Sequence, residues 1–189
     1  MSLLQQALAW GKTRAVTDNR LIATPAGPNP WNAIAEFRGR RFRASIGRSG
    51  ATHEKREGDG ASPIGIWPMR RLFFRPDRVT PKTVLPLREI RPEDGWCDDP
   101  ARPEYNRLVR LPFAGSHETM WMDSGLYDLV VELGYNDDPP IAGKGSAIFL
   151  HVIRPDHGAT AGCLALARDD LLQVLAEIGP AAAVEFRSA

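Results

Sequence analysis

The chain has 189 residues, 43% hydrophobic and 25% charged, a composition that fits one soluble globular domain with its own core. Its formal net charge of +1 argues against a nucleic-acid-binding protein, because such binding depends on clustered positive charge. No stretch approaches the roughly 20 apolar residues of a membrane span, so we expect no transmembrane segment.

The N-terminal segment predicts a short amphipathic helix, because Leu3, Leu4, Ala7 and Leu8 recur at helical spacing. It has neither the basic start nor the apolar run of a secretory signal. We therefore expect residues 1–32 to be an N-terminal helix and lead-in. We also expect the chain as written to be cytoplasmic, whereas a missing leader would make it periplasmic.

Residues 32–47 alternate apolar and polar side chains on both sides of Gly39, which predicts a β-hairpin. The arginine-rich stretch at residues 38–43 falls on this hairpin, which favours a solvated hairpin tip over a nucleic-acid patch. Residues 48–68 are polar and rich in glycine, and they predict a loop that enters a strand.

Residues 75–118 contain seven of the 16 prolines, a density that breaks helices and central strands. So much loop in a compact domain is typical of a lid or a binding loop. The alternative is a disordered insertion, but four aromatic residues offer hydrophobic anchors: Trp96, Tyr105, Phe113 and Trp121.

The second half predicts regular elements. Strands are expected at residues 126–133, 147–153 and 183–186, the second of them central because it is almost continuously apolar. A helix is expected from Asp169 to Ile178, with acidic residues in its first turn and Gly179-Pro180 after it. Many strands and few helices predict a mainly β fold with one or two packed helices.

Cys163 is the candidate nucleophile. It lies between small residues and, by this prediction, directly before the helix, where the helix dipole would favour the thiolate and lower the pKa. Gly162 would let the backbone bend so that N–H groups face a developing oxyanion. His151, at the end of the apolar strand, is the candidate general base, because a rigid element would hold it.

Other interpretations of these residues stay open. Cys163 alone could be a buried apolar side chain, and His151 alone could be structural. A zinc site would have three ligands, His151, His157 and Cys163, but the spacing lacks the paired pattern of zinc sites and no fourth ligand is evident. We therefore expect no metal and no cofactor. Cys97 and Cys163 could form one disulfide, which sequence alone cannot decide.

Two motifs together resemble the L,D-transpeptidase (YkuD-like) family. The segment from Ser146 to His151, followed by Thr160-Ala161-Gly162-Cys163, resembles the family's strand histidine and Ser/Thr-x-Gly-Cys motif. The segment Asp59-Gly60-Ala61-Ser62-Pro63-Ile64-Gly65 resembles its Asp-Gly-x-Thr-Pro-x-Gly motif, which leads into a core strand. The resemblance covers residues 33–187, so we expect a catalytic domain at residues 33–189 with an insertion at 75–118.

The resemblance implies a mainly β catalytic domain that acts on peptidoglycan stem peptides or muropeptides. Cys163 would attack the carbonyl at the L-centre of diaminopimelate, expel D-alanine and form a thioester. The Val152 backbone carbonyl would orient His151, and backbone N–H groups around Gly162 and Cys163 would form the oxyanion hole. Carbapenems, which acylate family members, would add to Cys163.

Two positions depart from the family's pattern. Many members have arginine two residues after the cysteine and histidine just before the glycine, where this chain has Ala165 and Ala161. Arg154 and His157, on the segment between His151 and Cys163, are candidates to replace the missing positive charge. Further substrate-binding candidates follow the motif or lie near predicted strand ends: Thr160, Tyr127, Asn136 and Asn106.

Three functions remain in competition. An amine would resolve the thioester in an L,D-transpeptidase, and water would resolve it in a cytoplasmic L,D-carboxypeptidase of muropeptide recycling. A non-catalytic peptidoglycan-binding module is the third, and it would leave Cys163 with the slow reactivity of an ordinary thiol.

Overall fold

The computed structural model describes residues 19–188, so the helix predicted near the N-terminus lies outside the described residues. The main sheet contains β1 (Arg20–Pro25), β2 (Asn32–Phe37), β3 (Arg40–Ser45), β6 (Gly65–Phe74), β7 (Leu87–Glu89), β11 (Leu129–Leu133), β12 (Phe149–Val152), β13 (Leu164–Leu166) and β14 (Ala183–Phe186). These nine strands run in the order β11-β12-β13-β3-β2-β1-β14-β6-β7, and β11 also pairs with β6, which closes the sheet on itself. The predicted mainly β fold is confirmed.

The predicted β-hairpin is confirmed as β2 and β3, joined by a two-residue turn at Arg38 and Gly39. Both turn residues have positive φ, 49° and 76°, as a tight hairpin turn requires. The arginines of this region lie on the hairpin, where Arg41 pairs with Glu36 and Arg40 with Glu177. The solvated-hairpin interpretation of the basic stretch therefore holds.

The central strands are buried on both faces, as the apolar run at residues 147–153 predicts. Strand β12 pairs with β11 on one side and β13 on the other, and all five residues of β11 are buried. Strand β11 begins three residues later than predicted because residues 125–128 form a turn, closed by the Asp128 N–H on the Gly125 carbonyl. Strand β14 occupies the predicted range.

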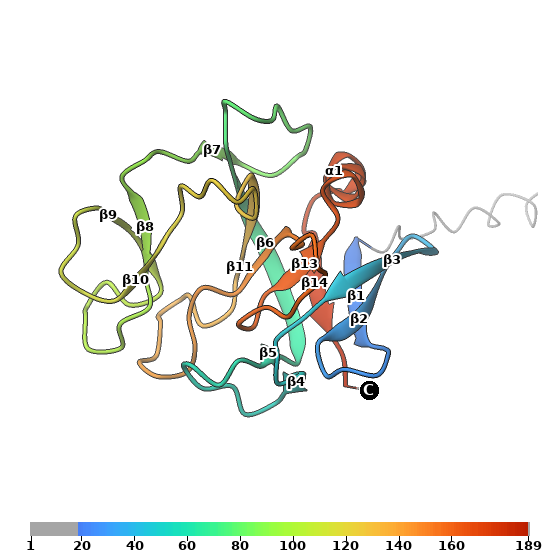
Figure 1. Ribbon diagram of the computed structural model, residues 1–189, viewed down its shortest axis with the longest axis horizontal. Helices are drawn as coiled ribbons and strands as arrows, with labels where there is room; N and C mark the ends of the chain where they lie inside the picture. Colours follow the sequence, from blue (N-terminus) through green and yellow to red (C-terminus); the bar gives the residue numbers. More distant parts are fainter. Residues whose placement is uncertain (1–18, 189) are drawn as a thin grey trace, which may run out of the picture.

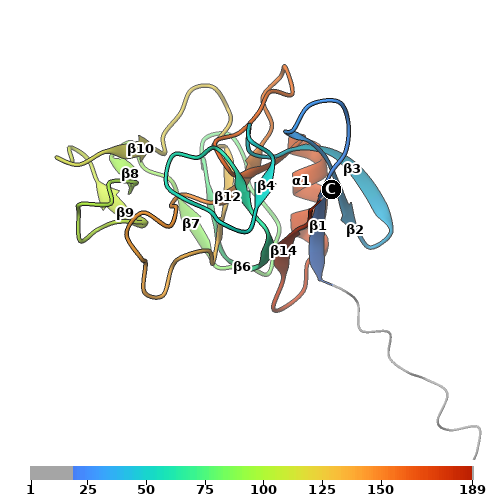
Figure 2. The ribbon, with the colours of Figure 1, turned by 90° about the horizontal axis from the view of Figure 1, so that it is seen from below.

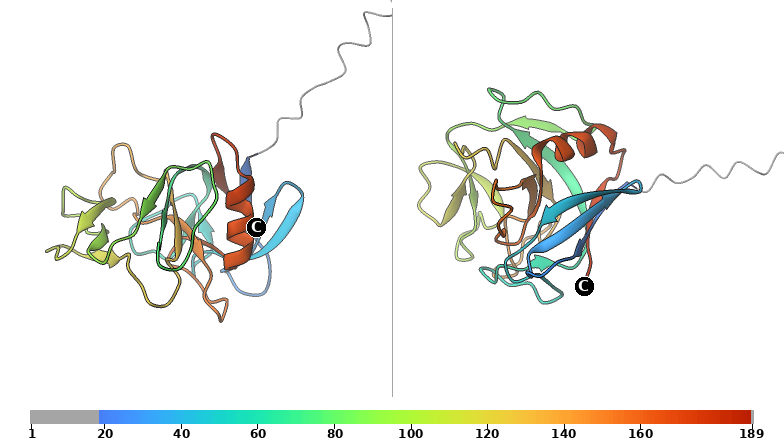
Figure 3. Two further views of the ribbon diagram at one scale, coloured as in Figure 1. Left: turned by 90° about the horizontal axis from the view of Figure 1, so that it is seen from above. Right: turned by 45° about the vertical axis from the view of Figure 1, so that its right-hand side comes forward.

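Helix α1 (Arg168–Glu177) matches the predicted helix to within one residue at each end. Leu171, Val174 and Leu175 are its buried residues, and they pack into the larger of two hydrophobic clusters. In Figure 3 the helix, drawn in red, lies alongside the blue N-terminal strands.

The proline-rich region is ordered rather than a structureless loop. It forms a second sheet of three short strands, β8 (Asp94–Cys97), β9 (Arg107–Arg110) and β10 (His117–Thr119), in the order β10-β8-β9. Of the predicted anchors, Trp96 and Tyr105 are buried. Figures 1 and 2 place this sheet at the end of the molecule opposite the β2–β3 hairpin.

Two features of the described chain were not predicted. Strand β1 pairs with both β2 and β14, so the main sheet already begins at Arg20, within the segment expected to be a lead-in. The glycine-rich loop contains a small parallel pair, β4 (Ala51–Thr52) and β5 (Ser62–Pro63). Within residues 19–188, no helix is long and apolar enough to cross a membrane.

Candidate active site

Strands β12 and β13 bring His151 and Cys163 to one face of the sheet. The two strands are parallel, with Leu150 opposite Leu164 and His151 opposite Ala165. Cys163 directly precedes β13, so its side chain shares a face with Ala165 and therefore with His151. Both side chains line one pocket of about 170 Å³.

The Cys163 sulfur is held by two backbone groups of the neighbouring segment. The Phe149 N–H donates to Sγ at 3.3 Å, and the Sγ–H donates to the Ala147 carbonyl at 3.2 Å. The side chain is buried, with 6% exposed. Burial, the largest cause, and the Glu118 carboxylate together raise the pKa of the Cys163 thiol to about 12, against the opposing effects of the Phe149 N–H and Lys55. Burial therefore favours the neutral thiol form of Cys163.

The imidazole of His151 is fixed by the backbone. Its Nδ1 lies 2.8 Å from the Val152 carbonyl oxygen, which can only accept, so Nδ1 carries the proton and Nε2 is the free base. This is the contact that the family resemblance implies. Burial lowers the pKa of His151 from 6.5 to about 4, although the hydrogen bond to Val152 opposes that shift. The imidazole is neutral at neutral pH.

The prediction that a helix activates Cys163 is wrong. Strand β13 follows Cys163, and helix α1 begins only at Arg168. The four residues of mostly extended chain between them, 164–167, exceed the reach of a helix dipole, which acts within about one turn. The thiol pKa is accordingly raised by burial rather than lowered.

Thr160 and Gly162 shape the backbone directly before Cys163. Thr160 Oγ1 accepts the Gly162 N–H at 3.1 Å and donates to the Cys163 carbonyl at 2.8 Å. Gly162 has a φ of 144°, and a Cβ there would lie 2.9 Å from the Ala61 carbonyl oxygen, so the position requires glycine. Because Thr160 already binds the Gly162 N–H, that group is not free to hold an oxyanion. The Cys163 N–H remains the candidate donor.

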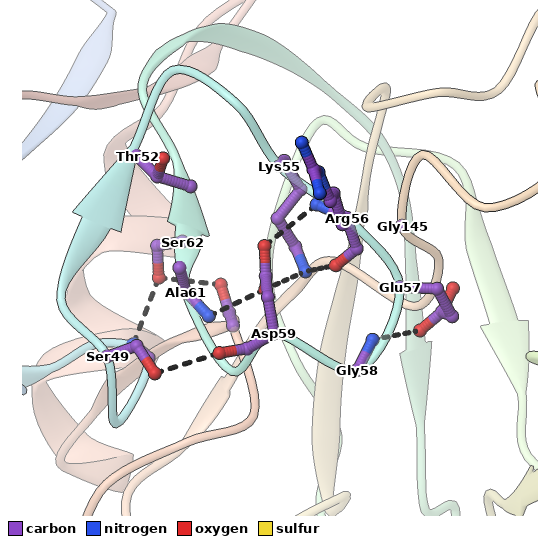
Figure 4. Close-up of polar contacts among 12 residues, drawn as sticks. Ser49, Thr52, Lys55, Arg56, Glu57, Gly58, Asp59, Ala61, Ser62 and Gly145 are labelled. Carbon is purple, nitrogen blue, oxygen red and sulfur yellow. Dashed lines mark hydrogen bonds and ion pairs between the residues drawn. The ribbon is translucent and has the colours of Figure 1, made fainter.

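The second sequence motif, residues 59–65, is hydrogen-bonded to the loop at residues 160–163. Ser62 Oγ donates to the Gly162 carbonyl at 2.7 Å and accepts the Gly47 N–H at 3.0 Å. Asp59, at the centre of Figure 4, accepts the N–H groups of Ala61 and Arg56 and pairs with Lys55 at 2.6 Å. The sequence predicted that this motif leads into strand β6, but nothing in it predicted that Ser62 would bind the Gly162 carbonyl.

The insertion supplies one wall of the pocket. Glu118 on β10 and Met122 beyond it line the pocket together with Tyr127. The Tyr127 hydroxyl donates to Glu118 Oε2 at 2.5 Å, and the Tyr127 ring meets the His151 ring edge-on at 5.5 Å between centroids. Tyr127 was predicted as a site residue, whereas Glu118 was missed, because a single glutamate in a loop carries no sequence signal.

The other predicted substrate-binding residues divide into two groups. Thr160 and Arg154 line the pocket, although Arg154 also pairs with Asp156 at 3.2 Å. The remaining three do not line this pocket: His157, Asn106 and Asn136.

The two asparagines have structural roles instead. Asn106 accepts the Trp96 indole N–H and the Ala147 N–H and donates to the carbonyls of Tyr135 and Asn136. The Asn136 amide closes its own loop through Ile141 and Gly145. Their amide groups already have protein partners.

The structure gives no support for a zinc site at His151, His157 and Cys163, because within residues 19–188 no group of three metal-ligating side chains is close enough to hold an ion. Both cysteines are free thiols, and Cys97 is fully buried.

Comparison with known proteins supplies the family. Residues 36–185 match the profile of the L,D-transpeptidase catalytic domain, YkuD. The chain belongs to this family. The resemblance stated from the two motifs is therefore confirmed, and it spans nearly the expected residues.

Two solved structures are similar to the chain, each at 13% identity. One is L,D-transpeptidase 1 of Mycobacterium tuberculosis, with a TM-score of 0.38 over 90% of this chain and 62% of that one. The other is the helical cell shape determining protein Pgp2 of Campylobacter jejuni, with a TM-score of 0.39 over 89% of this chain and 46% of that one. The chain thus spans less than two thirds of either protein. No curated protein matches.

This member of the L,D-transpeptidase family lacks two side chains that many members carry near the cysteine. Ala165 lies opposite His151 and is buried, and Ala161 lines the pocket. Arg154 is consequently the one arginine or lysine among the residues that line this pocket.

Proposed function

We propose that this chain is a cysteine acyltransferase that cleaves the diaminopimelate–D-alanine bond of peptidoglycan stem peptides. The observation that carries the proposal is the pairing of Cys163 and His151 in one pocket, with Nδ1 of His151 held by Val152 and Nε2 left free. Membership of the L,D-transpeptidase family supplies the substrate class.

The first half of the reaction starts from neutral groups. Burial disfavours both the thiolate and the imidazolium, so the proton leaves Cys163 as the sulfur attacks rather than beforehand. The sulfur forms a bond to the carbonyl carbon, and His151 Nε2 takes the thiol proton. The Cys163 N–H holds the oxyanion. When the tetrahedral intermediate collapses, the imidazolium returns its proton to the leaving amine of D-alanine, and a thioester remains on Cys163.

The second half releases the acyl group. The amine of a second stem peptide attacks the thioester carbonyl, His151 accepts a proton from that amine, and the sulfur leaves as a thiol that takes the proton back. The product is an amide cross-link and the enzyme is regenerated. Water in place of the amine would give a free carboxylate, which is the L,D-carboxypeptidase reaction.

Mass spectrometry of a diaminopimelate tetrapeptide incubated with the enzyme, with and without an acceptor peptide, tests the proposal. We expect a cross-linked product when acceptor is present and a thioester adduct on Cys163 at short times. Tripeptide alone in both tubes would assign the water-resolved reaction. Unchanged tetrapeptide in both would overturn acyl transfer and favour a binding module.

We also propose that carbapenems acylate Cys163 by ring opening. The matched control is Cys97, which is 0% exposed and whose thiol pKa is raised, chiefly by burial. The expected result is one adduct per chain, located on the peptide that contains Cys163. An adduct on Cys97 alone would contradict the assignment of the nucleophile.

A further inference from the structure

A carboxylate stands in the same pocket as the nucleophile. Glu118 lines the pocket with Cys163, yet it comes from β10 of the insertion, 45 residues earlier in the chain. Tyr127 binds one of its oxygens, Oε2. Within residues 19–188, Glu118 forms no salt bridge with a lysine, arginine or histidine.

The cations around the pocket already have partners. Arg154, which lines the pocket, pairs with Asp156. Lys55 does not line it but is near enough to act on the pKa of Cys163, and it pairs with Asp59. The wall of the pocket therefore contains a carboxyl group, that of Glu118, for which the described residues supply no cationic partner. Burial is the main cause that raises the pKa of the Glu118 carboxyl, and a bound cation would favour its ionised form.

In its ionised form, Glu118 disfavours the thiolate of Cys163. The Glu118 carboxylate acts on the Cys163 sulfur and raises the pKa of its thiol. A positive group bound beside Glu118 would remove that effect, because opposite charges at short distance cancel in the field felt by the sulfur. The arrangement thus favours a substrate that carries a positively charged group.

We propose that Glu118 is a specificity-determining residue that binds a primary ammonium group of the acyl donor beside Cys163. This inference rests on the proposed function. The group that Glu118 would bind is the free amine of the donor's diamino acid. The bound ammonium balances the carboxylate and so assists the nucleophile.

The donor fits this role better than the acceptor. An acceptor amine must be unprotonated to attack the thioester, and a neighbouring carboxylate would stabilise its protonated, unreactive form. The ammonium of the donor takes no part in bond making, so it can stay charged throughout.

A competing explanation is that Glu118 only braces the Tyr127 ring against His151. Two variants separate the explanations. Glu118→Gln keeps an acceptor for the Tyr127 hydroxyl and removes the charge, whereas Tyr127→Phe removes the hydrogen bond and keeps the charge. Asp123→Asn is the matched control, because the Asp123 side chain is a nearby carboxylate that is 96% exposed and does not line the pocket.

The first test needs no peptidoglycan. Cys163 is modified with 2-aminoethyl methanethiosulfonate, which carries an ammonium, and with neutral ethyl methanethiosulfonate, and the two rates are followed on the Cys163 peptide by mass spectrometry. A hydrogen bond to a charged group predicts that the ratio of cationic to neutral rate falls roughly 10- to 100-fold in Glu118→Gln. It should be retained in Asp123→Asn and Tyr127→Phe. An unchanged ratio in Glu118→Gln, or an equal loss in Tyr127→Phe, would overturn the proposal.

The second test uses the tetrapeptide with its side-chain amine free or acetylated. The preference of the wild-type enzyme for the free amine, measured as kcat/KM, should fall by a similar factor in Glu118→Gln. Turnover with no change in this preference overturns the role of Glu118 and leaves the proposed function standing. A changed reagent ratio without turnover of either peptide overturns the proposed function and leaves the ammonium site standing.

Discussion

The two faces of the central strands serve different cores. Along β11, Val131 faces the larger cluster, which also contains α1 residues, while its neighbour Val130 faces the smaller cluster. Strand β12 divides in the same way, with Leu150 in the larger cluster and Phe149 in the smaller one. Alternation of side chains along a strand produces this division.

The smaller cluster is the one that contains the candidate nucleophile. It contains Cys163, Tyr127 and Phe149 together with Trp96 of the insertion and Met120 just after it. The larger cluster joins the hairpin, α1 and β14, and it contains neither catalytic candidate. One face of the sheet therefore stabilises the fold, and the other positions the site with help from the insertion.

The largest expected effect separates the two cysteines. Cys163→Ala should lower kcat by at least about 10⁴-fold, the scale of loss when a nucleophile is removed. Cys97→Ala, outside the pocket, should leave kcat within a few-fold. Steady-state turnover of the tetrapeptide measures both, with circular dichroism to confirm that each variant is folded. Full activity of Cys163→Ala would remove the basis of the mechanism.

Acid should destabilise the protein through His151. Its pKa is about 4 in the folded chain against 6.5 ordinarily, so the unfolded chain binds the proton more tightly. The contribution of His151 to stability is complete above pH 6.5 and is lost as the pH falls toward 4, by about 3 kcal/mol at 1.36 kcal/mol per pKa unit.

Urea unfolding of wild type and His151→Gln across this pH range measures the effect. The difference between the two curves of unfolding free energy against pH isolates the contribution of His151 from that of carboxylates that titrate in the same pH range. Parallel curves would show that His151 is not buried in its neutral form.

A matched pair of substitutions compares the two faces directly. Val130 and Val131 are adjacent on β11 and both fully buried, and Val130 lies opposite His151. Replacing either with alanine should lower the free energy of unfolding by about 2 kcal/mol, from lost transfer energy and the cavity left behind.

Only Val130→Ala should also lower kcat/KM, by roughly tenfold, because a small displacement of a catalytic group is costly. Val131→Ala should keep the wild-type value. Urea unfolding and tetrapeptide turnover test the pair, and equal effects on turnover would show that the two faces are not functionally distinct.

The smallest expected effect concerns the support of the nucleophile loop. Ser62→Ala leaves the Gly47 N–H and the Gly162 carbonyl without their shared partner, at a cost of about 1–2 kcal/mol. We expect a several-fold lower kcat with little change in KM. Ser62→Thr should restore kcat, because threonine keeps the hydroxyl. Ser49→Ala is the control, since the Ser49 hydroxyl is exposed and binds the Asp59 carbonyl instead. Loss of activity in both alanine variants would argue for a general effect on the loop.

Local patterns in the sequence determined the elements that need only their own residues. Alternation around Gly39 gave the β2–β3 hairpin, the apolar run gave the buried strand β12, and helical spacing gave α1. The two family motifs also identified Cys163, His151 and the contact of His151 with Val152. Periodicity, turn chemistry and motif spacing are all readable along the chain.

Only the tertiary structure decided the features that depend on distant partners. Strand β1 is a strand because β2 and β14 flank it, and Cys163 keeps its proton because the fold buries it. Glu118 shares a pocket with Cys163 across 45 residues of chain, and Ser62 binds the Gly162 carbonyl across 100 residues. Burial and long-range hydrogen bonds set the pKa values and the geometry of a site, and neither is written in the local pattern of residues.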